Sequence, residues 1–224
     1  MSVPFWAAAL EPGPHTTSHA GPLVIEHREI GRVRLPSGRI VASDPFFDPD
    51  VTPFARAVSP GEYPVRLAIA RLADGDQRNA AAWVVFKDAP VAAWRGATVT
   101  GSGTTTDLGK AIAYFVESGT GSFLSPEAAA VLDARLDDKT ADEIRDQMQA
   151  NATAAGDWAV VEWAEHPMLN VVLFSTAYGD GAYGCYWGDD SAGSPVLLLT
   201  DFGLLDPPSA DTGAGEPRRW WKFW

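Results

Sequence analysis

The stretch YPVRLAIARLADGDQRNAAAWVVFKD, residues 63–88, decides the fold class of this 224-residue chain. Its first half places Val65, Leu67 and Ile69 at every second position, which is the period expected of a strand with one buried face. An Asp-Gly-Asp turn follows, and the second half resumes an apolar strand pattern. Strands joined by so short a turn pair antiparallel, so the stretch predicts an antiparallel β protein.

Strand patterns continue on either side of this hairpin. Residues 31–44, GRVRLPSGRIVASD, carry alternating apolar residues around a Pro-Ser-Gly turn, which predicts a second hairpin. Residues 110–118, KAIAYFVES, form a short continuous apolar run that suits a strand or a helix, and we interpret it as a strand.

A third hairpin is predicted over residues 171–187, where Tyr-Gly-Asp-Gly forms the turn and holds Asp180 at the rim of the sheet. In its second strand Tyr183, Cys185 and Trp187 share one face by the period of two. We expect this aromatic-rich face to pack inward.

Two helices interrupt the strands. SPEAAAVLDARL begins with Ser125 as N-cap and Pro126 at the first helical position. TADEIRDQMQAN follows, with Thr140 and Glu143 at the spacing of a capping box. We therefore predict a helical pair over residues 126–150.

Together, these patterns predict a mainly β or α+β fold, an antiparallel two-layer sheet of sandwich type with a short helical pair inserted late in the chain, around residues 126–150. One globular domain is expected over residues 23–206. We expect an irregular arm over 1–22, a flexible linker over 207–217 and an aromatic, basic tail over 218–224.

Composition restricts the partners. The formal net charge is −12 and the sequence pI is about 4.6, so the long-range field repels nucleic acid. An acidic surface can attract a basic protein, but solubility alone also explains the charge and is the interpretation that we favour. Cys185 is the only cysteine, the first residues do not resemble a signal peptide, and no apolar run is long enough to span a membrane. We expect a cytoplasmic protein with no membrane span and no cofactor.

Four blocks occur in a distinctive order and spacing: LPSGRIVASDPF, VESGTGSF, YGDGAYGCYWG and LLTDFG. They resemble the bacterial domain-of-unknown-function family 4241, with a match over approximately Gly31 to Leu205. The resemblance implies a bacterial cytosolic protein and a fold shared with that family, and it brings no established activity. Glu117 stands where many relatives are expected to carry Asp.

Each block ends in or near a carboxylate, namely Asp44, Glu117, Asp180 and Asp201. If the strands bring these side chains together, the cluster is a candidate catalytic site or a ligand set for a hard cation. The alternative is that each one stabilises its own turn, as Asp commonly does before Pro or between glycines.

A second candidate site is the segment SGTGS. Its backbone amides can form an anion-binding nest near the helix that starts after Ser125. No G-x-S-x-G elbow occurs, and Cys185 suits a small core residue. His15 and His19 are four apart, but they lie in a Pro-rich arm rather than on a helix, so we predict no metal site. The candidate ligand-binding residues are Ser118, Gly119, Thr120, Gly121, Tyr183 and Trp187.

The tail RRWWKFW alternates three cations with four aromatic side chains. We expect the tail to dock through Trp220, Trp221, Phe223 and Trp224. The surface that it binds is that of its own chain, of a second copy or of a protein partner. Our first functional hypothesis is a non-enzymatic binding or protein-interaction module of an immunity-like kind. The alternative is a hydrolase or metal-dependent enzyme that uses the carboxylates, so whether the protein is an enzyme stays open.

Overall fold

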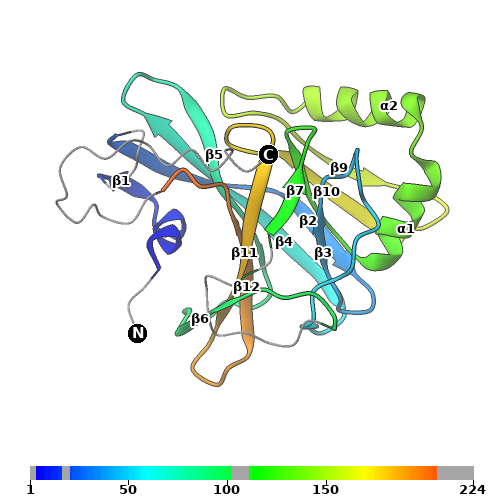
Figure 1. Cartoon of the computed structure of the whole chain (residues 1–224), viewed down its shortest axis with the longest axis horizontal. Coiled ribbons are helices and arrows are strands. Elements are labelled where there is room, and N and C mark those ends of the chain that lie inside the picture. Colours follow the sequence, from blue (N-terminus) through cyan, green and yellow to red (C-terminus); the bar gives the residue numbers. More distant parts are fainter. Residues whose placement is uncertain (1–3, 17–20, 102–110, 112, 206–224) are drawn as a thin grey trace.

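The computed structural model describes residues 4–16, 21–101, 111 and 113–205, and its strands form two antiparallel sheets (Figure 1). The larger sheet has the order β1-β2-β4-β5-β12-β11-β6, with β7 also paired to β11. Its strands are β1 Gly13–His15, β2 Leu23–Leu35, β4 Gly61–Leu72, β5 Gln77–Val85, β6 Ala93–Gly96, β7 Ala113–Val116, β11 Gly181–Asp189 and β12 Pro195–Asp201. The smaller sheet has the order β3-β8-β10-β9, from β3 Val41–Ser43, β8 Thr120–Leu124, β9 Trp158–Glu162 and β10 Asn170–Ser175. The two-layer antiparallel fold predicted from sequence is confirmed.

Three apolar clusters hold the layers together. The first lies between the two sheets and includes Leu67 from the larger sheet and Phe174 from the smaller one. The second covers the outer face of the larger sheet, where Trp6 packs with Trp83. The third lies between the smaller sheet and the helices α1 Pro126–Arg135 and α2 Asp138–Gln149. The smaller sheet is therefore buried on both faces, with the helical pair on its outer side (Figure 1).

The hairpin predicted over residues 63–88 is present in the structure. β4 pairs antiparallel with β5, and Val65 and Leu67 face the core between the sheets. Ala68 and Ala70 on the opposite face are also fully buried, because the N-terminal segment covers that face. Residues 113–116 of the ambiguous KAIAYFVES run form strand β7, as predicted.

The hairpins predicted over 31–44 and 171–187 are wrong in one respect. Both turns occur, but β3 pairs with β8 rather than β2, and β10 pairs with β8 and β9 rather than β11. In each case the chain crosses from one sheet to the other at the turn. The physical reason is burial on both faces: successive residues of β3 and β10 alternate between the central core and the helix-facing core, so both strands belong in the middle layer.

Both predicted helices are present. Ser125 caps α1 by accepting a hydrogen bond from the Ala128 amide, and Pro126 occupies the first helical position, as predicted. The capping box at Thr140 and Glu143 is wrong, because α2 begins earlier and the Asp137 side chain accepts the bond from the Thr140 amide. Asp caps a helix as well as Thr does, and its earlier position extends the helix by most of a turn.

The segment predicted as an irregular arm contains regular structure. Phe5–Leu10 forms a 3-10 helix and β1 pairs with β2. Trp6 stacks on Tyr186 with ring centroids 4.0 Å apart, which anchors this helix to the larger sheet. The tail with its aromatic residues, like the linker before it, lies outside the described residues. Within the described part of the chain, neither helix has the length and apolar character needed to cross a bilayer.

Candidate functional site

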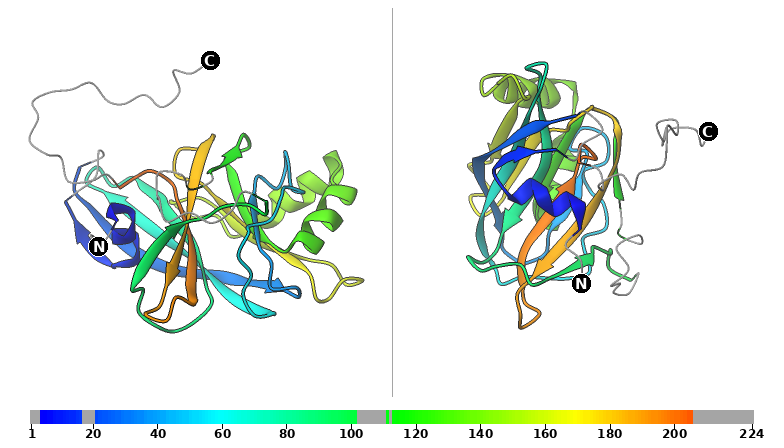
Figure 2. Two further views of the ribbon diagram at one scale, coloured as in Figure 1. Left: turned by 60° about the horizontal axis from the view of Figure 1, so that its bottom comes forward. Right: turned by 90° about the vertical axis from the view of Figure 1, so that its left-hand side faces the viewer.

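Three turns from distant parts of the sequence meet at one edge of the molecule. They are the loop after β3 at residues 44–50, the β7–β8 turn at 117–119 and the β10–β11 crossover at 176–180. We call these turns, with the adjoining residues 113–116, 120–121 and 181, the rim. Figures 1 and 2 show the light-blue loop, the green turn and the gold crossover side by side. Three of the four sequence blocks singled out above contribute to the rim.

Asp44 joins two of these turns. Its side chain is 2% exposed, and its oxygens accept hydrogen bonds from the amides of Glu117 at 2.8 Å and Ser118 at 2.7 Å. The Ser118 hydroxyl donates to the same carboxylate at 2.8 Å, and the Phe46 amide completes an Asx turn at 2.9 Å. Four donors thus compensate the buried charge, and backbone amides supply three of them.

The Asp44 carboxylate lies where the sequence predicted a nest for a bound anion. Amides at the start of the SGTGS segment do surround an anion, but the anion is the protein's own Asp44 carboxylate. The Thr120 amide bonds to the Ser118 hydroxyl, and from Thr120 onward the segment is strand β8. The α1 N-terminus is capped by its own serine, so it does not contribute to this nest.

The third turn is fastened through Gly119. The Thr176 amide donates to the Gly119 carbonyl at 3.0 Å, and the Thr176 hydroxyl lies between two acceptors, the Gly179 carbonyl at 2.5 Å and the Gly119 carbonyl at 3.1 Å. Gly119 has φ +75°, a conformation that favours glycine, and a Cβ there would lie 3.4 Å from Gly179. The Tyr183 hydroxyl donates to the Gly179 carbonyl at 2.8 Å, so the crossover is also tied to β11.

The remaining ligand-binding candidates are separated. Thr120 and Gly121 are buried in β8, and Gly121 packs so closely on Tyr114 and Phe174 that a Cβ would lie 2.6 Å from the Tyr114 hydroxyl. Tyr183 and Trp187 face inward with Cys185, as predicted, but Tyr183 lies at the rim and Trp187 lies near the far end of β11. The structure does not bring all six residues to one place.

The four candidate carboxylates also have different surroundings. Glu117 and Asp180 are exposed on rim turns, next to buried Asp44 in the first case. Asp201 lies at the end of β12, where it accepts a hydrogen bond from the Gly203 amide at 3.0 Å. Within the described residues, no three His, Cys, Asp or Glu side chains are grouped as they are in a metal site.

Exposed apolar side chains are concentrated on the rim. Phe115 in β7 is 74% exposed and Phe47 is 66% exposed, the two highest values among the large hydrophobic residues that the structure describes. Tyr178, in the crossover, is 49% exposed, and the Arg78 guanidinium lies 4.9 Å from its ring centroid. A surface of this kind is typical of an interaction site.

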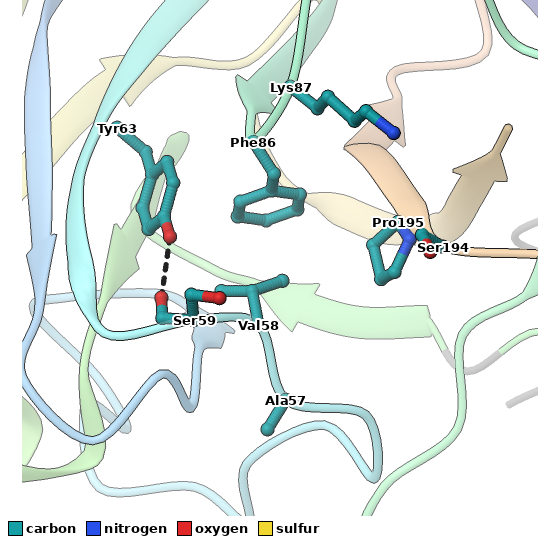
Figure 3. Close-up of a pocket in the computed structure, with 8 residues that line it drawn as sticks. All are labelled: Ala57, Val58, Ser59, Tyr63, Phe86, Lys87, Ser194 and Pro195. Carbon is teal, nitrogen blue, oxygen red and sulfur yellow. Dashed lines mark hydrogen bonds between the residues drawn. The ribbon is translucent and has the colours of Figure 1, made fainter. Parts of the chain in front are cut away.

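A second candidate lies beyond the opposite end of β11. A hollow with a volume of about 370 Å³ lies between Tyr63, Phe86 and Val58. Figure 3 shows these residues, with Lys87 extending along one side. The Tyr63 hydroxyl donates to the Ser59 carbonyl, and burial raises the pKa of Tyr63. Lys87 is already paired with Asp190 at 2.6 Å, which leaves little unpaired charge for a ligand.

Next to this hollow, Asp189 is fully buried between two arginines. Arg56 approaches one carboxylate oxygen at 2.7 Å and Arg95 approaches the other at 2.6 Å. Arg56 also donates to the Gly193 carbonyl and lies over the Trp187 ring. Sequence reasoning missed this cluster. The available signal was the pair Asp189-Asp190 after a strand, but the two arginines are isolated in sequence and no spacing connects them to it.

The single thiol is unsuited to nucleophilic chemistry. Cys185 is fully buried, its sulfur lies 3.2 Å from the Thr200 hydroxyl, and burial raises the pKa of the thiol to about 12. Burial also raises the pKa of Tyr183. Both groups therefore stay protonated at neutral pH.

The fold and the rim define a class: a two-sheet antiparallel β protein with a helical pair on one side and an acidic, aromatic edge of three turns. Residues 33–200 match the family model described as "Protein of unknown function (DUF4241)". The chain belongs to this family, as the four sequence blocks indicated. No curated protein and no solved structure matches the chain.

Proposed function

We propose that this protein is a non-enzymatic protein-interaction module and that the rim is its binding surface. The observation that carries the proposal is the exposure of Phe47, in the loop after β3, and of Phe115, in β7 just before the turn that Asp44 fastens to this loop. Exposed aromatic side chains on a rigid support are suitable anchors for a protein partner, because little conformational entropy is lost when they bind.

The charge of the rim supports a basic partner. Asp48, Asp50, Glu117 and Asp180 are all exposed, and the rim segments contain no Lys, Arg or His. The net charge of −12 points the same way and opposes nucleic acid as a partner. A cytoplasmic, immunity-like role, in which the rim occupies the functional surface of a basic protein, fits these properties.

The alternative, a carboxylate-based hydrolase or metal-dependent enzyme, has less support. Asp44 already accepts four hydrogen bonds, so its lone pairs are largely occupied by the turns it holds. Asp201 stabilises the turn that follows β12. Of the four candidate carboxylates, only Glu117 and Asp180 are exposed at the rim, and an acid/base pair also needs environments that differ.

The test is quantitative crosslinking in cells of the source organism, comparing three proteins. The rim variant combines Phe115→Ser with Glu117→Lys, and the matched control combines Met168→Ser with Asp88→Lys, two exposed positions away from the rim. We expect partners that the wild type and the control recover equally and that the rim variant loses by at least about tenfold, equivalent to 1.4 kcal/mol. Equal recovery by all three proteins, or no reproducible partner in any growth condition, would overturn the proposal.

A further inference from the structure

The rim has a chemical complement within the same chain. Its segments 44–50, 113–121 and 176–181 carry four exposed carboxylates and no cation, and the four make no ion pair with another described residue. Phe47, Phe115 and Tyr178 add exposed aromatic surface. A ligand that satisfies this surface must carry both cations and aromatic rings.

Residues 218–224, RRWWKFW, have this composition. Three cations alternate with four aromatic side chains, in a chain whose net charge is otherwise strongly negative. Aromatic side chains are large contact surfaces, and Arg pairs well with carboxylates and with ring faces. The number of cations nearly equals the number of exposed rim carboxylates.

The chain connection allows contact within one molecule. Thr200 pairs with Cys185, four residues along the strand that starts at the rim, so the end of β12 lies roughly 10–14 Å from the rim at about 3.4 Å per residue. Leu205 is four residues further and lies at most about 14 Å beyond that point. The thirteen residues from Leu205 to Arg218 span up to roughly 43–47 Å when extended. This length exceeds the sum of the two distances that separate Leu205 from the rim.

We infer that the rim binds residues 218–224 of its own chain, so that the tail is an intramolecular occupant of the partner site. This inference rests on the proposed function of the rim. A tethered segment acts at an effective concentration on the order of millimolar. A basic aromatic partner must therefore displace the tail, and the tail sets a threshold for partner affinity.

Engineered disulfides test the contact in the full chain. Because Cys185 is buried and stays protonated, introduced thiols are the reactive ones. The rim pair is Asp48→Cys with Glu216→Cys, and the control pair is Met168→Cys with Glu216→Cys, where Met168 is 65% exposed and precedes the end of β10 distant from the rim. We expect an intramolecular disulfide to form at least about tenfold faster in the rim pair. Equal rates would overturn the inference, and disulfide-linked dimers as the main product would assign the rim to the tail of a second copy.

A peptide experiment supplies a second readout. The full-length variant with Trp220, Trp221, Phe223 and Trp224 replaced by Ser is titrated with a labelled RRWWKFW peptide in fluorescence anisotropy. Adding Phe115→Ser and Glu117→Lys should raise the Kd of the peptide at least about tenfold, whereas adding Asp88→Lys should leave it unchanged. Unchanged Kd values in both would overturn the inference. If partner recovery in cells still depends on the rim in that case, the proposed function stands without the tail.

Discussion

Strand β11 separates two buried aspartates that are compensated in opposite ways. At the rim, Asp44 is held by three backbone amides and one hydroxyl. At the far end, Asp189 is held by two guanidinium groups, of Arg56 and Arg95. Amides are fixed parts of the chain, so Asp44 determines the conformation of turns. Guanidiniums belong to long side chains, so Asp189 connects a loop and an edge strand that are far apart in sequence.

The difference has a functional consequence. The amides that hold Asp44 carry no net charge, and the exposed carboxylates around it make no ion pair with a described residue. The nearby arginines Arg78 and Arg145 lie instead over the rings of Tyr178 and Phe46. At the far end the charges are internally matched, with Lys87 and Asp190 forming a further pair. The rim is therefore the end of β11 whose surface is suited to a charged partner.

The largest effect is expected at Asp44. Asp44→Ala leaves three amides and a hydroxyl without their acceptor in a nearly water-free place, and we expect a loss of about 3–5 kcal/mol of unfolding free energy. Asp189→Ala should cost less, about 2–3 kcal/mol, because Arg56 and Arg95 are 22% and 42% exposed and can rehydrate. Urea unfolding of both variants measures the difference. A larger loss at Asp189 would contradict this account of the two sites.

Salt should separate the two sites further. The cost of Arg56→Ala, about 2 kcal/mol at 50 mM NaCl, should fall by roughly half in 1 M NaCl, because the ion pair it removes is partly exposed and screened. The cost of Asp44→Ala should change little, because its hydrogen bonds do not depend on a mobile counter-charge. Parallel unfolding titrations at the two salt concentrations provide the measurement. Equal salt responses would indicate that the guanidinium and amide environments are electrostatically alike.

The middle of β11 should respond to alkaline pH. The folded-state pKa of Cys185 is about 12, because of burial, against about 8.5 in an unfolded chain. The unfolded state therefore releases this proton first, so the contribution to stability is complete below about pH 8 and is lost as pH rises toward 12, at up to about 1.4 kcal/mol per pH unit. Cys185→Ala should flatten the decline between pH 9 and 10.

Tyr186 adds to this decline at higher pH. Burial raises its pKa from 10 to about 12, so its share begins near pH 10. Melting temperatures from pH 7 to 11 for the wild type and Cys185→Ala compare the two contributions. Identical profiles for the two proteins would mean that the thiol is accessible in the folded state, contrary to its position in the core.

The sequence predicted the layers better than the connections between them. Alternation in Val65, Leu67 and Ile69 is local, and it correctly indicated antiparallel strands. Whether the arms of a turn pair with each other depends on what covers their second face, which is a tertiary property. Val171 and Leu173 face the helices while Val172 and Phe174 face the other sheet, and only the fold makes this distinction visible.

The candidate site was predictable to a similar extent. Asp44, Glu117 and Asp180 were selected because each lies within a distinctive block, and the structure places all three on rim turns. Their different surroundings could not be read from sequence, because three of the four donors to Asp44 lie more than seventy positions away. The exposure of Phe47 and Phe115 was missed for the same reason, since an apolar residue in a strand or beside one is normally buried.

The smallest effect is expected at Asp180, the residue that the turn sequence Tyr-Gly-Asp-Gly made most conspicuous. Its side chain is exposed, and its turn is held instead by Thr176 and Tyr183, which bond to Gly119 and Gly179. Asp180→Asn and Asp180→Ala should therefore both change the unfolding free energy by less than about 0.5 kcal/mol.

Thr176→Val in the same turn is the matched comparison, and it should cost about 1 kcal/mol because it removes the hydroxyl that donates to the carbonyls of Gly179 and Gly119. Chemical denaturation with and without calcium measures all three variants. A cation bound by rim carboxylates would raise the melting temperature of the wild type but not that of Asp180→Asn, and that result would favour the metal-dependent alternative. If Asp180→Ala instead costs as much as Thr176→Val without calcium, the carboxylate supports the turn.

The proposed interaction surface requires a further outcome. Asp180→Lys should weaken partner binding, although Asp180→Asn and Asp180→Ala leave the unfolding free energy almost unchanged. That result would separate the charge of Asp180, which is used for binding, from the charge of Asp44, which is used for folding.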